Sequence, residues 1–178
     1  MRGSRGKSEM NRVRDKKLVK RVLLIVLVLL ACVGCDQMTK SVARQSLVKS
    51  EAISLLNDTV RLQYVENTGV FMSLGANISE NLRYWVFTLL MGFFLAGMLV
   101  LLMTSPKIPN VESIALSLML GGGVGNLIDR IFNEGRVIDF MNLGIGSLRT
   151  GIFNVADIAI LVGGIWLFCV FFNCLGSI

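Results

Sequence analysis

The chain has 178 residues, of which 53% are hydrophobic and 17% are charged, and its mean hydropathy is +0.66. An average soluble chain carries about 25% charged residues, so this composition argues against a disordered chain, a fibrous repeat or a secreted disulfide scaffold and favours one membrane domain. The sequence contains no histidine, which removes Ser/His/Asp triads, Cys/His dyads and His-ligated metal sites. Any chemistry must therefore use carboxylates, lysine, hydroxyls or thiols.

The first 21 residues are polar and basic. Nine of the 18 Lys and Arg residues lie between Arg2 and Arg21, directly before an apolar run. This positive-inside pattern predicts a cytoplasmic N-terminus. We expect residues 1–21 to be a cytoplasmic tail without a fold, able to contact anionic lipid, and residues 22–178 to form a single domain. Because the net charge of +6 is concentrated in this tail, we expect no nucleic-acid partner.

Four apolar segments follow the tail. The first apolar run, residues 22–34, is shorter than the about 20 residues that a membrane-spanning helix requires. A first helix must therefore continue through Asp36, Thr39 and Lys40 to cross a membrane. Residues 84–103, 111–131 and 152–175 are the other predicted spans, and Pro106 and Pro109 end the second one. Glycines at positions 121, 122, 123 and 125 predict close helix packing in the third.

Two long connections, residues 45–83 and 132–151, lie on one side of the membrane if four helices cross it. Both contain alternating positions typical of strands, namely Val60, Leu62 and Tyr64 in the first and Val137, Asp139 and Met141 in the second. The predicted fold is therefore an all-α membrane protein with four transmembrane helices, both termini in the cytoplasm and a small extracytoplasmic β-sheet.

The four cysteines lie in apolar runs, where a thiol behaves as a small hydrophobe; they are Cys32, Cys35, Cys169 and Cys174. The run Leu29-Leu30-Ala31-Cys32 also has the pattern of a lipobox in a bacterial lipoprotein precursor. This leaves open the alternative that the N-terminal segment is a cleaved signal peptide.

Four aspartates lie within or beside the apolar segments, at Asp36, Asp129, Asp139 and Asp157. An aspartate at the centre of a membrane helix costs about 2.5–3.5 kcal/mol, so a chain retains one for pairing, capping or chemistry. In the predicted topology all four lie toward the outer ends of the helices, where they can converge on one layer.

Purely structural explanations exist for three of these acids. Asp36 has Lys40 four residues later, a spacing that forms ion pairs on a helix. Asp129 is next to Arg130, and Asp157 follows Asn154 at the spacing of a helix N-cap. Asp139 is the exception, because no cation is closer to it in sequence than Arg136.

Two aspartates in an apolar setting indicate the chemistry of aspartic hydrolases. Two carboxyl groups at close range cannot both ionise, so they share one proton. The ionised carboxylate then accepts a proton from an attacking water while the protonated one donates to the substrate. Asn126, Asn142 and Asn154 are candidates to hold such a dyad by hydrogen bonds. The alternative is a four-helix transporter or proton-relay protein whose acids carry ions.

Five sequence blocks resemble, in order, the signature blocks of lipoprotein signal peptidase, also called signal peptidase II. They are DQMTK (36–40), ENTGVF (66–71), GNLIDR (125–130), GRVIDF (135–140) and FNVAD (153–157). The resemblance covers residues 22–172 and leaves the basic tail outside it. Phe71 and Met72 depart from the family pattern.

The resemblance implies a bacterial inner-membrane aspartic peptidase that removes the signal peptide of a prolipoprotein just before its diacylglyceryl-modified cysteine. It implies no metal or organic cofactor, a monomer in membrane lipid, a loop that cradles the substrate and inhibition by cyclic peptides of the globomycin type. Matched block by block, the catalytic pair is Asp139 and Asp157. The residues that support the site or contact substrate are Asp36, Lys40, Asn67, Gly69, Asn126, Asp129, Arg130 and Asn154.

Overall fold

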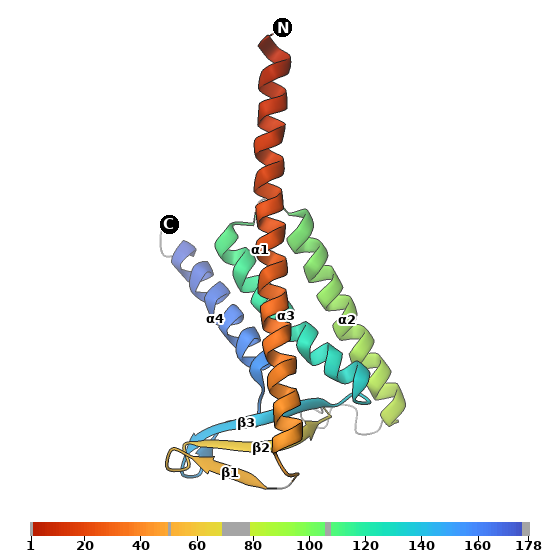
Figure 1. Ribbon diagram of the computed structural model, residues 1–178, viewed down its shortest axis with the longest axis vertical. Helices are drawn as coiled ribbons and strands as arrows, with labels where there is room; N and C mark the ends of the chain where they lie inside the picture. Colours follow the sequence, from red (N-terminus) through yellow and green to blue (C-terminus); the bar gives the residue numbers. More distant parts are fainter. Residues whose placement is uncertain (1, 50, 69–78, 106–107, 176–178) are drawn as a thin grey trace.

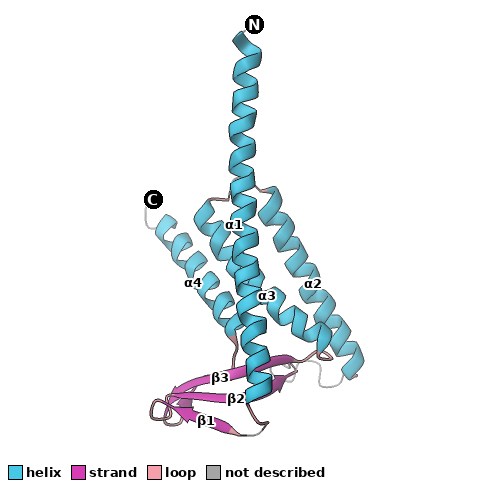
Figure 2. Ribbon diagram, viewed as in Figure 1, coloured by secondary structure: helices cyan, strands magenta, loops and turns pink. Residues whose placement is uncertain are grey.

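Four helices and one small antiparallel sheet make up the computed structural model, which describes residues 2–49, 51–68, 79–105 and 108–175. The helices are α1 (Arg2–Ser46), α2 (Glu80–Thr104), α3 (Asn110–Phe132) and α4 (Val155–Leu175). The strands are β1 (Ala52–Leu55), β2 (Val60–Asn67), β3 (Val137–Ile145) and β4 (Leu148–Arg149). Both termini lie at one end of the helices and the sheet lies at the other (Figures 1 and 2). The predicted fold class, four membrane-length helices with a small β-sheet, is confirmed.

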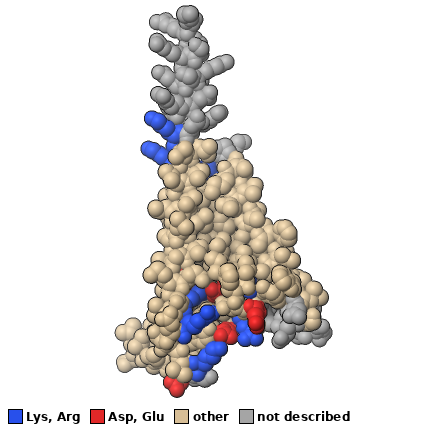
Figure 3. All heavy atoms as spheres, turned by 45° about the vertical axis from the view of Figure 1, so that its right-hand side comes forward, with Lys and Arg blue, Asp and Glu red and all other residues tan. Residues whose placement is uncertain are grey.

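Each of the four helices contains a segment long and apolar enough to cross a membrane, over Leu18–Ser46, Tyr84–Thr104, Asn110–Phe132 and Val155–Phe172. Helices suit this setting because they bond every backbone group internally where no water is present. As expected, the first span continues through Asp36, Thr39 and Lys40. Figure 3 shows an uncharged band between basic side chains at one end and mixed charges at the sheet end. The protein therefore crosses the membrane several times.

The expectation that residues 1–21 have no fold was wrong, because α1 already begins at Arg2 and projects beyond the other helices (Figure 1). Extending a helix that the span has already nucleated is cheaper than starting a new one, and Lys and Arg are good helix formers. At the junction Arg21 donates a hydrogen bond from Nη2 to the carbonyl of Leu102 near the end of α2, at 3.0 Å.

Helix α3 is the centre of the bundle, since 50% of its span is buried compared with 11–17% in the other three. Its glycines allow this packing. A Cβ at Gly121 would lie 2.7 Å from Cys32 of α1, and one at Gly122 would lie 2.3 Å from the carbonyl oxygen of Ala156 of α4. Gly123 faces α2 in the same way. The predicted close approach is therefore confirmed, and a different glycine serves each neighbouring helix.

The sheet has the order β1-β2-β3-β4 and combines strands from both long connections, as predicted. Strand β2 pairs with β3 so that Val65 lies opposite Asp139, and a bulge between Leu62 and Val65 shifts the register. Strand β3 follows directly after α3, and β4 leads into α4. This path brings Asp139 beside the first turn of α4.

Candidate active site

Asp139 of β3 and Asp157 in the first turn of α4 are joined through one residue, Asn154. The side-chain Nδ2 of Asn154 donates to Oδ1 of Asp139 at 2.7 Å, and its backbone N–H donates to Oδ2 of Asp157 at 3.1 Å. Asn154 is fully buried and Asp139 is 3% exposed. Both carboxylates are therefore held by one buried residue at the start of a helix.

Asn154 also caps α4. Its Oδ1 accepts a hydrogen bond from the backbone N–H of Asp157 at 3.0 Å, while the carboxylate of Asp157 reaches back to the N–H of Asn154. This reciprocal arrangement is a capping box, which satisfies two N–H groups at the helix end. The structural explanation of Asp157 as part of a helix cap is thus confirmed, and the cap orients its carboxylate.

Two further asparagines complete the hydrogen bonding of the pair. Asn67 at the end of β2 donates from Nδ2 to Oδ2 of Asp139 at 2.9 Å. Asn126 of α3 donates from Nδ2 to Oδ1 of Asp157, also at 2.9 Å. Every carboxylate oxygen of the two aspartates therefore receives an N–H donor.

Burial raises the pKa of Asp139 to about 6. The hydrogen bond from Asn67 lowers this pKa, the negative charge of Asp157 raises it, and the hydrogen bond from Asn154 lowers it. The net effect favours the protonated form of the Asp139 carboxyl.

A buried ion cluster lies behind the two aspartates. The ammonium Nζ of Lys40 is 2.7 Å from Oδ2 of Asp36, 2.9 Å from Oδ2 of Asp129 and 3.0 Å from Oδ1 of Asn126. The predicted pairing of Asp36 with Lys40 is confirmed. Asp129 also pairs with Lys40, which comes from another helix. This cation lies 89 positions away in sequence, so local spacing did not reveal it.

The cluster also binds the backbone around the two aspartates. Oδ1 of Asp36 accepts from the N–H of Ala156 in the first turn of α4 at 2.9 Å. Oδ2 of Asp129 accepts from the N–H of Ile138, next to Asp139, at the same distance. Each carboxylate of the cluster therefore holds the backbone neighbouring one aspartate of the pair.

Gln37 is a member of this network that the sequence analysis did not single out. Its Nε2 contacts Oδ2 of Asp36 at 3.2 Å, the carbonyl of Gly125 at 3.1 Å and Oδ1 of Asp129 at 3.0 Å. The available signal was a polar amide inside a membrane helix, one residue after Asp36. It links α1 to α3 at the level of the ion cluster.

The prediction that Asn142 helps to hold the dyad was wrong. Its Nδ2 donates to the carbonyl of Thr150 at 2.6 Å, and its Oδ1 accepts from Arg149. Alternate residues of a strand point to opposite faces, and Asn142 is three positions after Asp139. It therefore serves the turn between β3 and β4.

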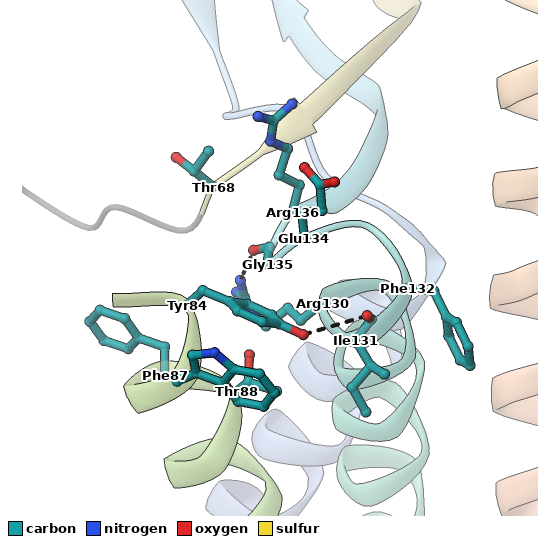
Figure 4. Close-up of a pocket in the computed structure, with 11 residues that line it drawn as sticks. Thr68, Tyr84, Phe87, Thr88, Arg130, Ile131, Phe132, Glu134, Gly135 and Arg136 are labelled. Carbon is teal, nitrogen blue, oxygen red and sulfur yellow. Dashed lines mark hydrogen bonds between the residues drawn. The ribbon is translucent and has the colours of Figure 1, made fainter. Parts of the chain in front are cut away.

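A cavity of about 440 Å³ adjoins this region between α2, the end of α3 and the start of β3 (Figure 4). Tyr84, Thr88 and Arg130 line it together with the turn at Gly135. Arg130 donates from Nη1 to the carbonyl of Gly135 at 3.1 Å, which fixes the turn before β3. Arg130 also lies close enough to Asp139 and Asp157 to interact with their charges.

The structure thus brings together nine of the ten site residues that were matched through the five sequence blocks: Asp36, Lys40, Asn67, Asn126, Asp129, Arg130, Asp139, Asn154 and Asp157. Gly69 lies outside the described residues, as do Phe71 and Met72. In the part of the chain that is described, no group of three acidic or thiol side chains is arranged to hold a metal ion.

A family model described as Signal peptidase (SPase) II matches residues 28–173 of the chain. The chain belongs to the signal peptidase II family. A lipoprotein signal peptidase of Hydrogenovibrio crunogenus is 34% identical over 158 residues, covering 89% of this chain and 87% of that protein. A lipoprotein signal peptidase of Leifsonia xyli subsp. xyli is 32% identical over 154 residues, covering 83% of this chain and 66% of that protein.

The fold of signal peptidase II is also found in a solved bacterial membrane enzyme, with a TM-score of 0.67 and 22% identity over 85% of this chain and 92% of that one. The resemblance inferred from the five sequence blocks is therefore confirmed. The protein is an aspartic endopeptidase of the membrane that removes signal peptides from prolipoproteins. The alternative of a transporter or proton-relay protein is not favoured.

Proposed function

We propose that Asp139 and Asp157 are the catalytic pair of this signal peptidase II. The observation that carries the proposal is the hydrogen bonding of the two acids, in which all four carboxylate oxygens receive N–H donors and Asn154 holds both residues. Carboxylates held by such bonds need little rearrangement when the reaction begins. A site of this kind is preorganised for catalysis.

The mechanism follows from one proton shared by two close carboxylates. The ionised carboxylate accepts a proton from a water molecule as its oxygen attacks the scissile carbonyl carbon, and the protonated carboxylate donates to the carbonyl oxygen. When the tetrahedral intermediate collapses, the carbon–nitrogen bond breaks and the proton taken from water passes to the leaving amine. One hydroxyl of the intermediate returns its proton to the second carboxylate, which restores the singly protonated pair. Since burial raises the pKa of Asp139 to about 6, its carboxyl retains a proton at mildly acidic pH.

The remaining residues act as positioning residues or contact the substrate. Lys40 holds Asp36 and Asp129, whose carboxylates bond to the backbone beside the catalytic pair. Asn67, Asn126 and Asn154 orient the carboxylates themselves. We assign Arg130 and Gly69 to substrate contact and support, on the resemblance of their sequence blocks.

We further propose the setting in which the reaction occurs. The substrate is a diacylglyceryl prolipoprotein cut just before its lipid-modified cysteine, and the protein works as a monomer in the bacterial inner membrane. The basic residues before the first span support cytoplasmic termini, which puts the sheet and the catalytic pair toward the outer face. Globomycin-type inhibitors are expected to bind between the aspartates.

The test is cleavage of a diacylated prolipoprotein peptide by the purified protein and by Asp139→Asn and Asp157→Asn. Removing an acid or base of the pair should lower kcat by at least about 10²- to 10⁴-fold. Asp58→Asn is the matched control, because Asp58 lies in the β1–β2 turn and pairs with Arg61 outside the site; this variant should retain full activity. Circular dichroism checks that each variant is folded. Full cleavage by either folded site variant would overturn the assignment of that aspartate.

The orientation has a separate test. In intact cells, a thiol reagent that does not cross membranes should label a cysteine placed at Ser147 of the β3–β4 turn but not one placed at Lys16, in a background without the native cysteines. The opposite pattern would reverse the proposed topology.

A further inference from the structure

The two faces of the sheet differ in polarity. Residues paired across an antiparallel ladder have their side chains on the same face, so the register assigns each residue to one side. One face carries the polar residues Ser54, Arg61 and Asn142. On the other face the side chains are apolar, among them those of Ile53, Leu55, Val60, Leu62, Leu143 and Ile145. The sheet is therefore amphipathic.

The apolar face is the one turned toward the helices. The extra residue of the bulge lies in β2, so β3 alternates regularly and Met141, Leu143 and Ile145 point to the same side as Asp139. Asp139 accepts a hydrogen bond from Asn154 at the start of α4, which identifies this side as the one facing the membrane. The hairpin turns at one end of the sheet extend past the start of α4 (Figure 1). Beyond the helix, this face therefore lies over lipid.

Large apolar side chains are exposed at these two turns. Leu56 in the β1–β2 turn is 76% exposed. Ile145 and Leu148 face each other across the β3–β4 turn and are 80% and 84% exposed. We call these three residues the apolar tip. In the part of the chain that is described, no helix covers the tip. Clustered exposed apolar side chains are typical of protein or membrane contact sites.

The two turns are joined to each other. Arg149 donates from Nη1 to the carbonyl of Asp58 in the β1–β2 turn at 2.7 Å. The N–H of Gly144 donates to the carbonyl of Thr59 at 2.9 Å. These bonds connect the β3–β4 hairpin to the β1–β2 turn, so the three side chains of the apolar tip belong to one end of the sheet rather than to separate loops.

The backbone at Leu56 is a second, independent observation. Its φ is 52°, in the left-handed region, and the next two residues, Asn57 and Asp58, have φ values of 52° and 67°. Asn and Asp tolerate this conformation, whereas a bulky apolar residue rarely adopts it. Backbone strain of this kind is concentrated at functional sites. A leucine that is both strained and exposed indicates that an apolar side chain is needed at this position.

Lipid fits the apolar tip better than the cleaved part of the substrate does. Ile145 is six residues after Asp139 in the same strand, which corresponds to about 20 Å. Groups beside the scissile bond therefore lie far from the tip. Ile158 and Leu161 near the start of α4 belong to a membrane span and are 41% and 62% exposed. The lipid-facing surface of the bundle thus begins directly beside the sheet.

We propose that the apolar tip inserts into the membrane leaflet on the sheet side, while the polar face of the sheet contacts water. The occupant is bulk lipid, which accepts apolar side chains without a shaped pocket. Insertion holds both turns at one depth in the membrane, and β3 carries Asp139 at a fixed level relative to it. The proposal concerns attachment of the sheet and does not depend on the assignment of the catalytic pair.

The depth of the tip can be measured with a fluorophore. Leu148→Cys and Ser54→Cys, each in a background without the native cysteines, are labelled and placed in phosphatidylcholine nanodiscs that contain one copy of the protein. Nitroxide groups on the acyl chains should quench the label at Leu148 more than the label at Ser54, and aqueous iodide should show the reverse order. Ser54 is the matched control, because it lies on the opposite face. Equal quenching by iodide at both positions would overturn the proposal.

A second pair of variants tests Leu56. Leu56→Asn suits the positive φ but removes the apolar side chain, whereas Leu56→Met keeps an apolar side chain. With the label at Leu148, Leu56→Asn should reduce quenching by the acyl-chain nitroxide and increase quenching by iodide. Leu56→Met should change neither. Circular dichroism checks that both variants are folded. Unchanged quenching in folded Leu56→Asn would refute insertion of the two turns as one unit.

The remaining occupants give different results. If the label at Leu148 is shielded from iodide only in nanodiscs with two copies, a second copy covers the tip and the proposal is wrong. Shielding that appears only after a prolipoprotein peptide is added would assign the tip to substrate and would equally contradict insertion. The pattern of quenching should be the same in Asp139→Asn. A failed anchor therefore leaves the catalytic assignment intact, and loss of the catalytic assignment leaves the anchor intact.

Discussion

Replacing Lys40 with methionine leaves the buried carboxylates of Asp36 and Asp129 without their cation. The ammonium is 2.7 Å from the first and 2.9 Å from the second, and none of the three side chains is more than 3% exposed. Water therefore cannot solvate the charges left behind. Removing one partner of a buried ion pair costs about 3–5 kcal/mol, and we expect Lys40→Met to lower the free energy of unfolding by that amount.

Lys49 supplies a matched control for the role of burial. It pairs with Glu66 at 2.8 Å, but the two side chains are 69% and 26% exposed. Exposed pairs contribute about 0–1 kcal/mol, so Lys49→Met should change stability by no more than this. The assay is SDS titration of each variant in detergent micelles, followed by circular dichroism. Equal losses in the two variants would refute the argument from burial. Combining Lys40→Met with Asp129→Asn removes one stranded charge and should recover part of the loss.

Three other predictions address the catalytic pair and the helix contacts. Asn154→Ala should lower kcat by about 10²-fold with a smaller change in KM, measured by peptide cleavage, because it removes the amide that donates to the Asp139 carboxylate and accepts from the N–H of Asp157, while the backbone N–H that donates to the Asp157 carboxylate remains. The kcat/KM of the wild type should fall as pH rises through about 6, where Asp139 loses its proton; Asn67→Ala removes a hydrogen bond that lowers this pKa, so the fall should move to higher pH. Gly122→Ala should lower the free energy of unfolding by about 1–3 kcal/mol, because the added Cβ would clash with the backbone of Ala156. Gly164→Ala should leave it unchanged, since nothing lies within 4 Å of the Cβ that this substitution adds.

The membrane spans could be predicted from the sequence because hydropathy acts locally. A run of apolar residues must leave water wherever the rest of the chain goes, so the starts and ends of α2 and α3 lie within a few residues of the predicted spans. The aspartates were recognisable for the opposite reason, since a charge in such a run is costly without a partner. The hydropathy pattern along the sequence therefore indicated both the four spans and the positions that needed explanation.

The partners of those aspartates could not be predicted in the same way. Lys40 and Asp129 meet only because α1 packs on α3, and the amide of Gln37 bridges the same two helices. The bulge between Leu62 and Val65 decides which residue lies opposite Asp139. These contacts depend on helix packing and strand register, which periodicity in one segment does not contain.

Asp157 shows why a structural explanation and a catalytic one need not compete. In a capping box the carboxylate accepts from the N–H of the cap residue, and here that residue is Asn154, whose side chain also bonds to Asp139. The hydrogen bonds that begin α4 therefore set the position of one catalytic carboxylate relative to the other. A variant that weakens the cap should consequently lose activity before it loses the helix, because packing of α4 against α3 stabilises the helix beyond its first turn. Circular dichroism measures the helix content of an Asn154→Ala sample, and peptide cleavage measures the activity of the same sample. Loss of helix at unchanged activity would contradict the claim that the cap positions the catalytic carboxylate.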